Sequence, residues 1–308
     1  MARTVTAQNP QLPIKSKAAR NAELKRQAVA YSFIAPNFIG FAVFTLCPIV
    51  FAFALAFLHW DGSNPITWAG IDNFKYLLTD DQFKAAFKNT IVYALGTVPL
   101  TLIMALFVAV LLNQKIKGRN FFRTVNFFPY VASLVAVAAV WNALFNPNMG
   151  PVNEILRLMG VDNPPGWSAD KDWAMFSVVF FSVWKNMGYY MIIYLAGLQG
   201  INAELYEAAS IDGVNTWQKF RYVTLPQLSN TTFFVLIMLT IQCFKVYDIV
   251  YMLTQGGPGT ATLVMVYDIY NKAFLSWDLG LASAEALVLF LMVLAVTLIQ
   301  FRVEKKRG

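Results

Sequence analysis

The chain has 308 residues, of which 57% are hydrophobic and only 13% are charged, and its formal net charge is +7. Because soluble domains carry about 25% charged residues, this composition excludes an ordinary soluble protein and indicates an integral membrane protein. The two cysteines, Cys47 and Cys243, lie far apart in the sequence, so we expect no disulfide framework. Because His59 is the single histidine, we also expect no metal site and no histidine-based catalytic triad.

The first residues of the chain, 1–27, are polar and basic, with six Lys and Arg residues against one acid, Glu23. The apolar run that follows is much longer than the apolar core of about 7–15 residues in a secretory signal peptide. We therefore predict a flexible cytoplasmic arm before the first membrane span.

Six apolar runs follow, and each is long enough to cross a bilayer, for which about 20 residues suffice. The predicted spans are 27–60, 89–112, 121–145, 173–198, 232–254 and 279–301. Pro36 and Pro48 should kink the first span and Pro99 the second, which membrane helices tolerate when neighbouring groups bind the freed carbonyls. The predicted fold is an all-α integral membrane protein, with six transmembrane helices over 28–302 and a tail at 303–308.

A polar segment of the chain, 199–229, separates the fourth span from the fifth. Its apolar residues Ile201, Leu205, Ala208 and Ala209 have the spacing of one helical face, which predicts a short amphipathic helix. Asn202 is the expected cap of this helix, and Glu204 places a negative charge in its first turn.

The same segment contains a predicted turn and a second helix. Asp212-Gly213 supplies the left-handed position that ends a helix and reverses the chain. Thr216 is the expected cap of the second helix, 217–222, and Pro226 is expected to end it because proline has no backbone N–H to donate. Ala208 and Ala209 are small enough to let the first helix enter a groove on another protein, with Leu205 beside them.

The distribution of charge predicts the orientation in the membrane. Six spans would put four segments on the same side of the membrane: the arm, the 113–120 loop with Arg123, the polar segment and the tail. These segments carry sixteen Lys and Arg residues against five acids. The three opposite loops carry six basic residues against ten acids. By the positive-inside rule the first set is cytoplasmic, so the net charge reflects topology and does not indicate nucleic-acid binding.

The polar segment also contains a motif: Glu207-Ala208-Ala209, three residues, Gly213, nine residues, the β-branched Val223, one residue, and Leu225-Pro226. This pattern resembles the cytoplasmic signature of the membrane subunits of binding-protein-dependent ABC importers, in which isoleucine is usual where Val223 stands. The flanking sequences, 195–207 and 254–258, are similar to the branch of maltose and glycerol-3-phosphate permeases. The resemblance covers about residues 28–302.

This resemblance implies that the chain is the permease subunit of an ATP-driven sugar importer in a bacterial or archaeal inner membrane, with both termini cytoplasmic. It implies that residues 202–213 couple the chain to a separate ATPase. The implied coupling residues are Leu205, Glu207, Ala208, Ala209, Asp212 and Gly213. The sequence itself has no Gly-Lys dipeptide and hence no phosphate-binding P-loop.

The resemblance therefore places ATP and Mg²⁺ on the partner ATPase and no cofactor in this chain, which is not expected to be an enzyme itself. It further implies a second six-span permease subunit and an extracytoplasmic solute-binding protein. The loop at Gly256, Gly257 and Pro258 is the expected contact for the binding protein.

Four charged residues lie inside the predicted spans: Lys185, Lys245, Asp248 and Glu285. Because a charge in lipid is costly, each should face the interior of the helix bundle or water, and Lys245 and Asp248 have the spacing to pair on one helix. These charges either tie helices together or line the translocation path. The resemblance maps the family's sugar pocket onto Lys185, Asn186, Tyr189, Gln242, Cys243 and Val246, and the charge argument adds Lys245 and Asp248 to the expected path.

Two alternatives stay open at this point. An importer of a non-sugar solute such as glycerol-3-phosphate would have the same signature. An ion-coupled secondary transporter would use the charges inside the spans and need no ATPase.

Overall fold

The computed structural model describes residues 17–114 and 116–306, which form two compact units, 1–54 and 55–308. The first unit contains α1 (Lys17–Phe41), a π-helical turn η1 (Ala42–Leu46) and α2 (Cys47–Leu55). Together they give a helical stretch of 33 residues, Glu23–Leu55, that is long and apolar enough to span a membrane. The predicted arm lies mostly outside the described residues, and its last part, from Lys17, is helical.

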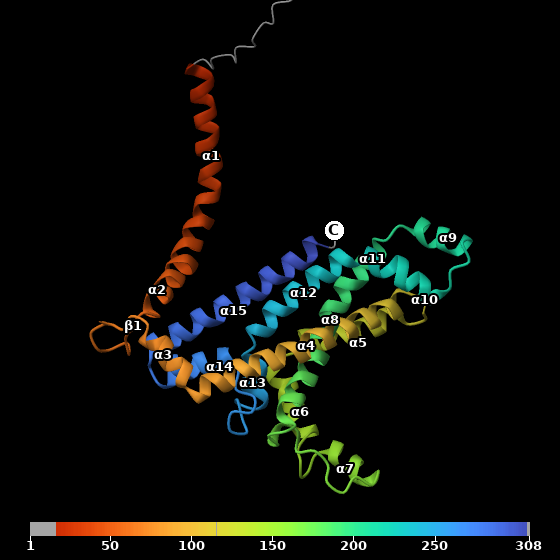
Figure 1. The fold of residues 1–308 in the computed structure, drawn as a ribbon. Coiled ribbons are helices and arrows are strands. Elements are labelled where there is room, and N and C mark those ends of the chain that lie inside the picture. Colours follow the sequence, from red (N-terminus) through yellow and green to blue (C-terminus); the bar gives the residue numbers. More distant parts are fainter. Residues whose placement is uncertain (1–16, 115, 307–308) are drawn as a thin grey trace, which may run out of the picture. The chain divides into compact units, whose positions relative to one another are not determined.

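The second unit is almost entirely helical (Figure 1). Its elements are β1 (Leu58–His59), β2 (Thr67–Trp68), α3 (Asp72–Thr79), α4 (Asp81–Asn113), α5 (Arg119–Val131), α6 (Leu134–Leu144), α7 (Pro151–Leu158), η2 (Trp167–Ala169), α8 (Ala174–Gln199), α9 (Ala203–Ile211), α10 (Thr216–Lys219), η3 (Phe220–Thr224), α11 (Leu225–Gln227), α12 (Ser229–Phe244), α13 (Asp248–Leu253), α14 (Met265–Tyr270), η4 (Asn271–Leu275) and α15 (Leu279–Lys305).

The only strands among the described residues form a small antiparallel hairpin, in which Leu58 lies opposite Trp68 and His59 opposite Thr67. The sequence analysis did not predict these strands, because each has only two residues. The side chain of Asn73 on α3 donates to the carbonyls of Ala56 and Leu58, both at 3.0 Å, and so fixes the hairpin to the helices.

The core of the second unit is organised around α8, which packs against α4, α5, α12 and α13. Fifteen of its 26 residues are buried, among them the large side chains Phe181, Tyr190 and Tyr194. At Gly188 the backbone of α5 comes so close that an added Cβ would lie 2.0 Å from the carbonyl oxygen of Asn126. The small residue therefore permits the close crossing of α5 and α8.

Among the described residues, three helices are long and apolar enough to cross a membrane: Glu23–Leu55, α4 and α15. Two bent pairs qualify if each counts as one span, namely α5 with α6, bent by 98°, and the 216–227 stretch with α12, bent by 66°. The fold is thus helical and contains three to five apolar spans, where the sequence predicted six. The predicted span that this count leaves out is α8. It is 26 residues long but carries two strongly polar residues, Lys185 and Asn186, near its centre.

Candidate functional site

Two of the predicted spans are broken in their middle, and the two breaks are the main features of the functional site. The third predicted span divides at residues 132–133 into α5 and α6, and the fifth divides at residues 245–247 into α12 and α13. Half-helix α6 packs against half-helix α13, and α8 contacts both α5 and α13. Because broken backbone inside a membrane protein is tolerated only where protein or a cavity receives it, these breaks mark the region where a path through the bundle is expected.

The break between α12 and α13 opens on a small cavity of about 120 Å³. The cavity is lined by Tyr93, Asn186, Gln242, Cys243, Lys245, Val246, Tyr247, Asp248 and Ile249. The structure therefore brings together six of the eight predicted path residues, all except Lys185 and Tyr189. The break also corrects one expectation: Lys245 is the C-cap of α12 and Asp248 begins α13, so the two do not share a helix, and among the described residues they form no ion pair.

A chain of hydrogen bonds connects three helices beside this cavity. Tyr190 donates to the Gln242 side-chain oxygen at 2.6 Å, and Gln242 donates to the Asn186 oxygen at 3.3 Å. The hydroxyl of Tyr93 on α4 donates to Ser182 at 2.9 Å. Amide and hydroxyl groups so arranged can exchange hydrogen bonds with the hydroxyls of a polar solute.

The break between α5 and α6 is stabilised by Lys185. The ammonium of Lys185 donates to the carbonyls of Pro129 and Ala132, at 2.8 and 3.2 Å. These carbonyls lack helical partners because α5 ends at Val131, and a cation at a helix C-terminus is also favoured by the helix dipole. Lys185 thus lies next to the predicted path but binds the break, while Tyr189 stacks on Tyr130 with ring centroids 4.6 Å apart.

A cluster of aromatic side chains that the sequence analysis did not single out begins at the break between α12 and α13. Tyr247, Tyr251, Tyr267 and Tyr270 pack together, with ring centroids between 5.2 and 6.4 Å apart, and join α13 to α14. Their spacing in sequence, i and i+4 on one helix and i and i+3 on the next, is a signal that periodicity could have found.

A buried charge cluster lies where α14, η4 and α15 meet the N-terminus of α4. The ammonium of Lys272 contacts the carboxylates of Asp268, Glu285 and Asp80, at 2.5, 2.8 and 3.1 Å. Asp268 and Glu285 are fully buried, and one oxygen of each has no hydrogen-bond partner among residues 17–114 and 116–306. The expectation that Glu285 faces the bundle interior is met, but its partner Lys272 was not predicted because it lies outside the predicted spans.

The polar segment folds as a helix, a turn and a second helix that lie together at one end of the second unit (Figure 1). Asn202 caps α9 by accepting from the backbone of Glu204 at 3.0 Å, and Gly213 has a φ of +72°, so both expectations are met. The second helix is capped by Asn215, one residue before the predicted Thr216, because Asn215 and Gln218 form a reciprocal capping box. Pro226 does not end this helix; it lies in the first turn of α11, where a missing N–H costs nothing.

The helix–turn–helix is closed by its own hydrogen bonds. Tyr206 contacts Thr224 at 3.0 Å, and Lys219 donates to Ser210 at 2.7 Å. Of the predicted coupling residues, Ala209 faces the inside of this element, whereas Leu205, Glu207, Ala208, Asp212 and Gly213 are exposed. Ile211 and Trp217 were not predicted, yet they are 87% and 69% exposed, so the apolar surface of the element lies around its turn.

The loop with Gly256, Gly257 and Pro258 is tightly held. Thr262, which is fully buried, donates its hydroxyl to the Gly257 carbonyl at 2.9 Å, and Asn89 on α4 donates to the carbonyl of Thr260 at 2.7 Å. The loop is therefore held in one conformation by bonds to α4 and within itself.

The sequence of residues 97–308 matches the family described as the binding-protein-dependent transport system inner membrane component. The chain is 35% identical over 280 residues to the lactose transport system permease LacF of Rhizobium radiobacter, covering 89% of this chain and 93% of that protein. It is 33% identical over 279 residues to the sn-glycerol-3-phosphate permease UgpA of Agrobacterium fabrum, covering 90% of this chain and 94% of the relative.

The fold is similar to a solved structure of a bacterial ABC transporter involved in import of the acidic polysaccharide alginate. The TM-score is 0.82 at 25% identity, and the match covers 92% of this chain and 98% of that chain.

Proposed function

The chain belongs to the family of inner membrane components of binding-protein-dependent transport systems, and from this we propose that it is the permease subunit of an ATP-driven sugar importer. Relatives that carry sugars, such as the lactose permease, support a sugar as the solute. The glycerol-3-phosphate permease among the relatives keeps a phosphorylated polyol as the second candidate.

The observation that carries the proposal is the meeting of two broken spans at a polar cavity beside α8. Sites for small molecules usually have volumes of about 300 Å³ or more. The cavity of about 120 Å³ is smaller, so the path is closed at this cavity in the present conformation. Opening requires the half-helices to move relative to α8. Rigid-body movement of this kind is the basis of alternating access, in which the path faces first one side of the membrane and then the other.

The topology in this proposal has six spans, with α8 as the fourth. A helix of 26 residues is about 39 Å long, enough to cross a bilayer. Its polar residues do not oppose this assignment, because Lys185 and Asn186 are buried against protein and not against lipid. Six spans together with the charge distribution support a cytoplasmic location of both termini and of the α9–α10 element.

The α9–α10 element is proposed to dock on a P-loop ATPase, which holds ATP and Mg²⁺. Its turn presents Ile211 and Trp217, and Glu207 is exposed beside them. Large apolar side chains exposed at a turn are typical of a protein–protein contact. A second six-span subunit and a solute-binding protein complete the proposed assembly, and the fixed loop at Gly256–Pro258 is the proposed contact for the binding protein.

The test uses the assembled transporter in proteoliposomes, with Gly213→Val against Gly160→Val. Both glycines have positive φ, +72° and +89°, and a Cβ added at either would have no other described atom within 4 Å, so valine imposes the same kind of backbone strain at each. We expect Gly213→Val to separate ATP hydrolysis from uptake and Gly160→Val to leave both unchanged. Normal uptake in Gly213→Val would contradict the docking role, and uptake that follows an ion gradient and survives ATP depletion would favour a secondary transporter.

A further inference from the structure

Helix α7 lies beyond α6, away from the core around α8 (Figure 1). In the described part of the chain no other helix packs extensively against it. The side of α7 that faces the protein is polar, and Asn153 on this side is only 1% exposed. The Asn153 amide donates to the carbonyls of Pro147 and Pro165, both at 3.0 Å. Its oxygen accepts from the indole of Trp167 at 2.6 Å. Arg157, one turn later, donates to the Pro147 carbonyl at 3.0 Å, so polar groups hold α7 to its own loop.

The outward side of α7 is apolar. Ile155, Leu158 and Met159 have the i, i+3, i+4 spacing of one helical face and are 57%, 81% and 75% exposed. Met149, just before the helix, is 89% exposed. A helix at the surface of a protein in water turns its apolar face inward, so the polarity of α7 is inverted. A helix of eight residues is also marginal by itself in water, and a contact that buries the outward face would stabilise it.

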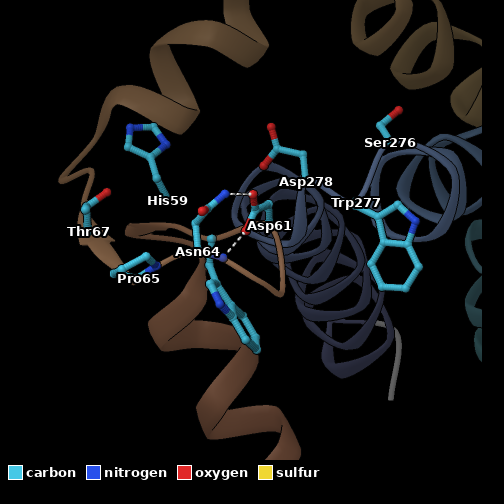
Figure 2. Close-up of a pocket in the computed structure, with 9 residues that line it drawn as sticks. His59, Asp61, Asn64, Pro65, Thr67, Ser276, Trp277 and Asp278 are labelled. Atoms are coloured by element: carbon cyan, nitrogen blue, oxygen red, sulfur yellow. Dashed lines mark hydrogen bonds between the residues drawn. The ribbon is translucent and has the colours of Figure 1, made fainter.

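The turn of the β1–β2 hairpin shows the opposite arrangement. Ser63 and Asn64 are exposed there, and their backbone N–H groups donate to Asp61 at 3.0 and 2.7 Å. Asp61 and Asp278 also line a pocket of about 580 Å³ beside the hairpin (Figure 2). Polar groups therefore meet water at this turn, whereas α7 turns its polar groups toward the protein.

Two contacts fix the level of α7 relative to the membrane spans. Trp167, which binds Asn153 of α7, packs edge to face against Trp173, with ring centroids 5.8 Å apart. Trp173 directly precedes α8, and tryptophan at the end of a span is typical of the membrane–water interface. The start of α7 is also close to the end of α6, since a Cβ added to Gly150 would lie 2.6 Å from the Leu144 carbonyl oxygen. The outward face of α7 therefore lies at the level of the lipid headgroups.

The outward face is small for a contact with another protein. One side of a stable protein–protein interface contributes about 20–30 residues, whereas this face presents four large apolar side chains. Glu154 and Arg157 pair at 3.4 Å, so α7 has no net charge that would select a charged partner. We propose that α7 is an interfacial anchor, whose outward face lies in the boundary between the headgroups and the acyl chains of the bilayer. The proposal goes beyond the proposed function and takes from it only that α8 is a membrane span.

The test places the photoreactive residue benzoylphenylalanine at one position at a time in the assembled transporter in proteoliposomes. It replaces Leu158 on the outward face, or Ser63 in the hairpin turn as the control, because both positions are exposed. After illumination, adducts with phospholipid and adducts with protein are identified by mass spectrometry. We expect at least about fivefold more phospholipid adduct at Leu158 than at Ser63. A phospholipid yield at Leu158 no higher than at Ser63 overturns the proposal, and so do adducts of Leu158 with another subunit in place of lipid.

A separate readout tests whether α8 is a span. A protease site inserted after Asp162, in the loop before α8, should be cut in spheroplasts. A site inserted after Asp212, in the turn beyond α8, should be cut only in inverted membrane vesicles. Cleavage of both sites in the same preparation would refute α8 as a span, and with it the topology of the proposed function, independently of the adducts at Leu158.

Discussion

The substitution Lys272→Met tests the account of the buried charge cluster most directly. Methionine retains most of the apolar stem of lysine but removes the ammonium that contacts Asp268, Glu285 and Asp80. Removing one partner of a buried ion pair costs about 3–5 kcal/mol, because the remaining charge is left uncompensated. Here three carboxylates would lose their common partner, so we expect a destabilisation of at least about 3 kcal/mol.

The free energy of unfolding would be measured on the purified chain by denaturant titration, with fluorescence of its eight tryptophans as the signal. The control is Lys75→Met, which removes the exposed ion pair of Lys75 with Asp72, whose side chains are 64% and 63% exposed. Exposed pairs contribute about 0–1 kcal/mol, so the control should change little. A loss in Lys272→Met no larger than that in Lys75→Met would refute the reasoning.

A companion variant, Glu285→Gln, has the opposite expected effect. The cluster has three carboxylates for one ammonium, and Glu285 has an oxygen without a partner. Glutamine keeps an acceptor for Lys272 and cannot ionise. We therefore expect this variant to be within about 1 kcal/mol of the wild type or more stable, since a neutral group is less costly to bury. A loss of unfolding free energy equal to that of Lys272→Met would contradict this expectation. It would show that the charges of the wild-type cluster already compensate one another.

Three further predictions concern the helices around the path. Gly188→Ala should cost about 1–3 kcal/mol in unfolding experiments because its Cβ would meet the Asn126 carbonyl, whereas Gly40→Ala, with no atom within 4 Å, should not destabilise. Lys185→Met should cost about 1–3 kcal/mol by leaving two carbonyls at the break unbound, with partial recovery in Lys185→Arg. Gln242→Leu, which leaves Tyr190 without its acceptor, should lower the uptake rate while ATPase binding, measured by co-purification, stays intact.

The sequence predicted well those features that depend on neighbouring residues. Asn202 as a cap and Gly213 in a left-handed turn follow from local backbone chemistry, and the structure confirms both. The residues of the predicted path also come together, since Asn186 and Gln242 both line the cavity between α8 and α12.

The breaks in the third and fifth spans could not be predicted in the same way. Hydropathy is continuous across residues 131–134, and the nearest proline, Pro129, lies inside α5 and does not itself mark where the helix ends. The group that stabilises it, Lys185, is more than fifty residues away in the chain, so its role depends on tertiary contact. For the same reason the sequence did not predict that Lys272, which lies in a predicted outer loop, contacts Asp80, Asp268 and Glu285.

The stacked tyrosines have a mechanical consequence. Because Tyr247 and Tyr251 pack on Tyr267 and Tyr270, α13 and α14 form one block that includes the fixed loop between them. A rotation at residues 245–247 would then displace that loop together with the wall of the cavity. Occupancy of the cavity and binding at the loop would be thermodynamically linked, each changing the affinity of the other by the same factor.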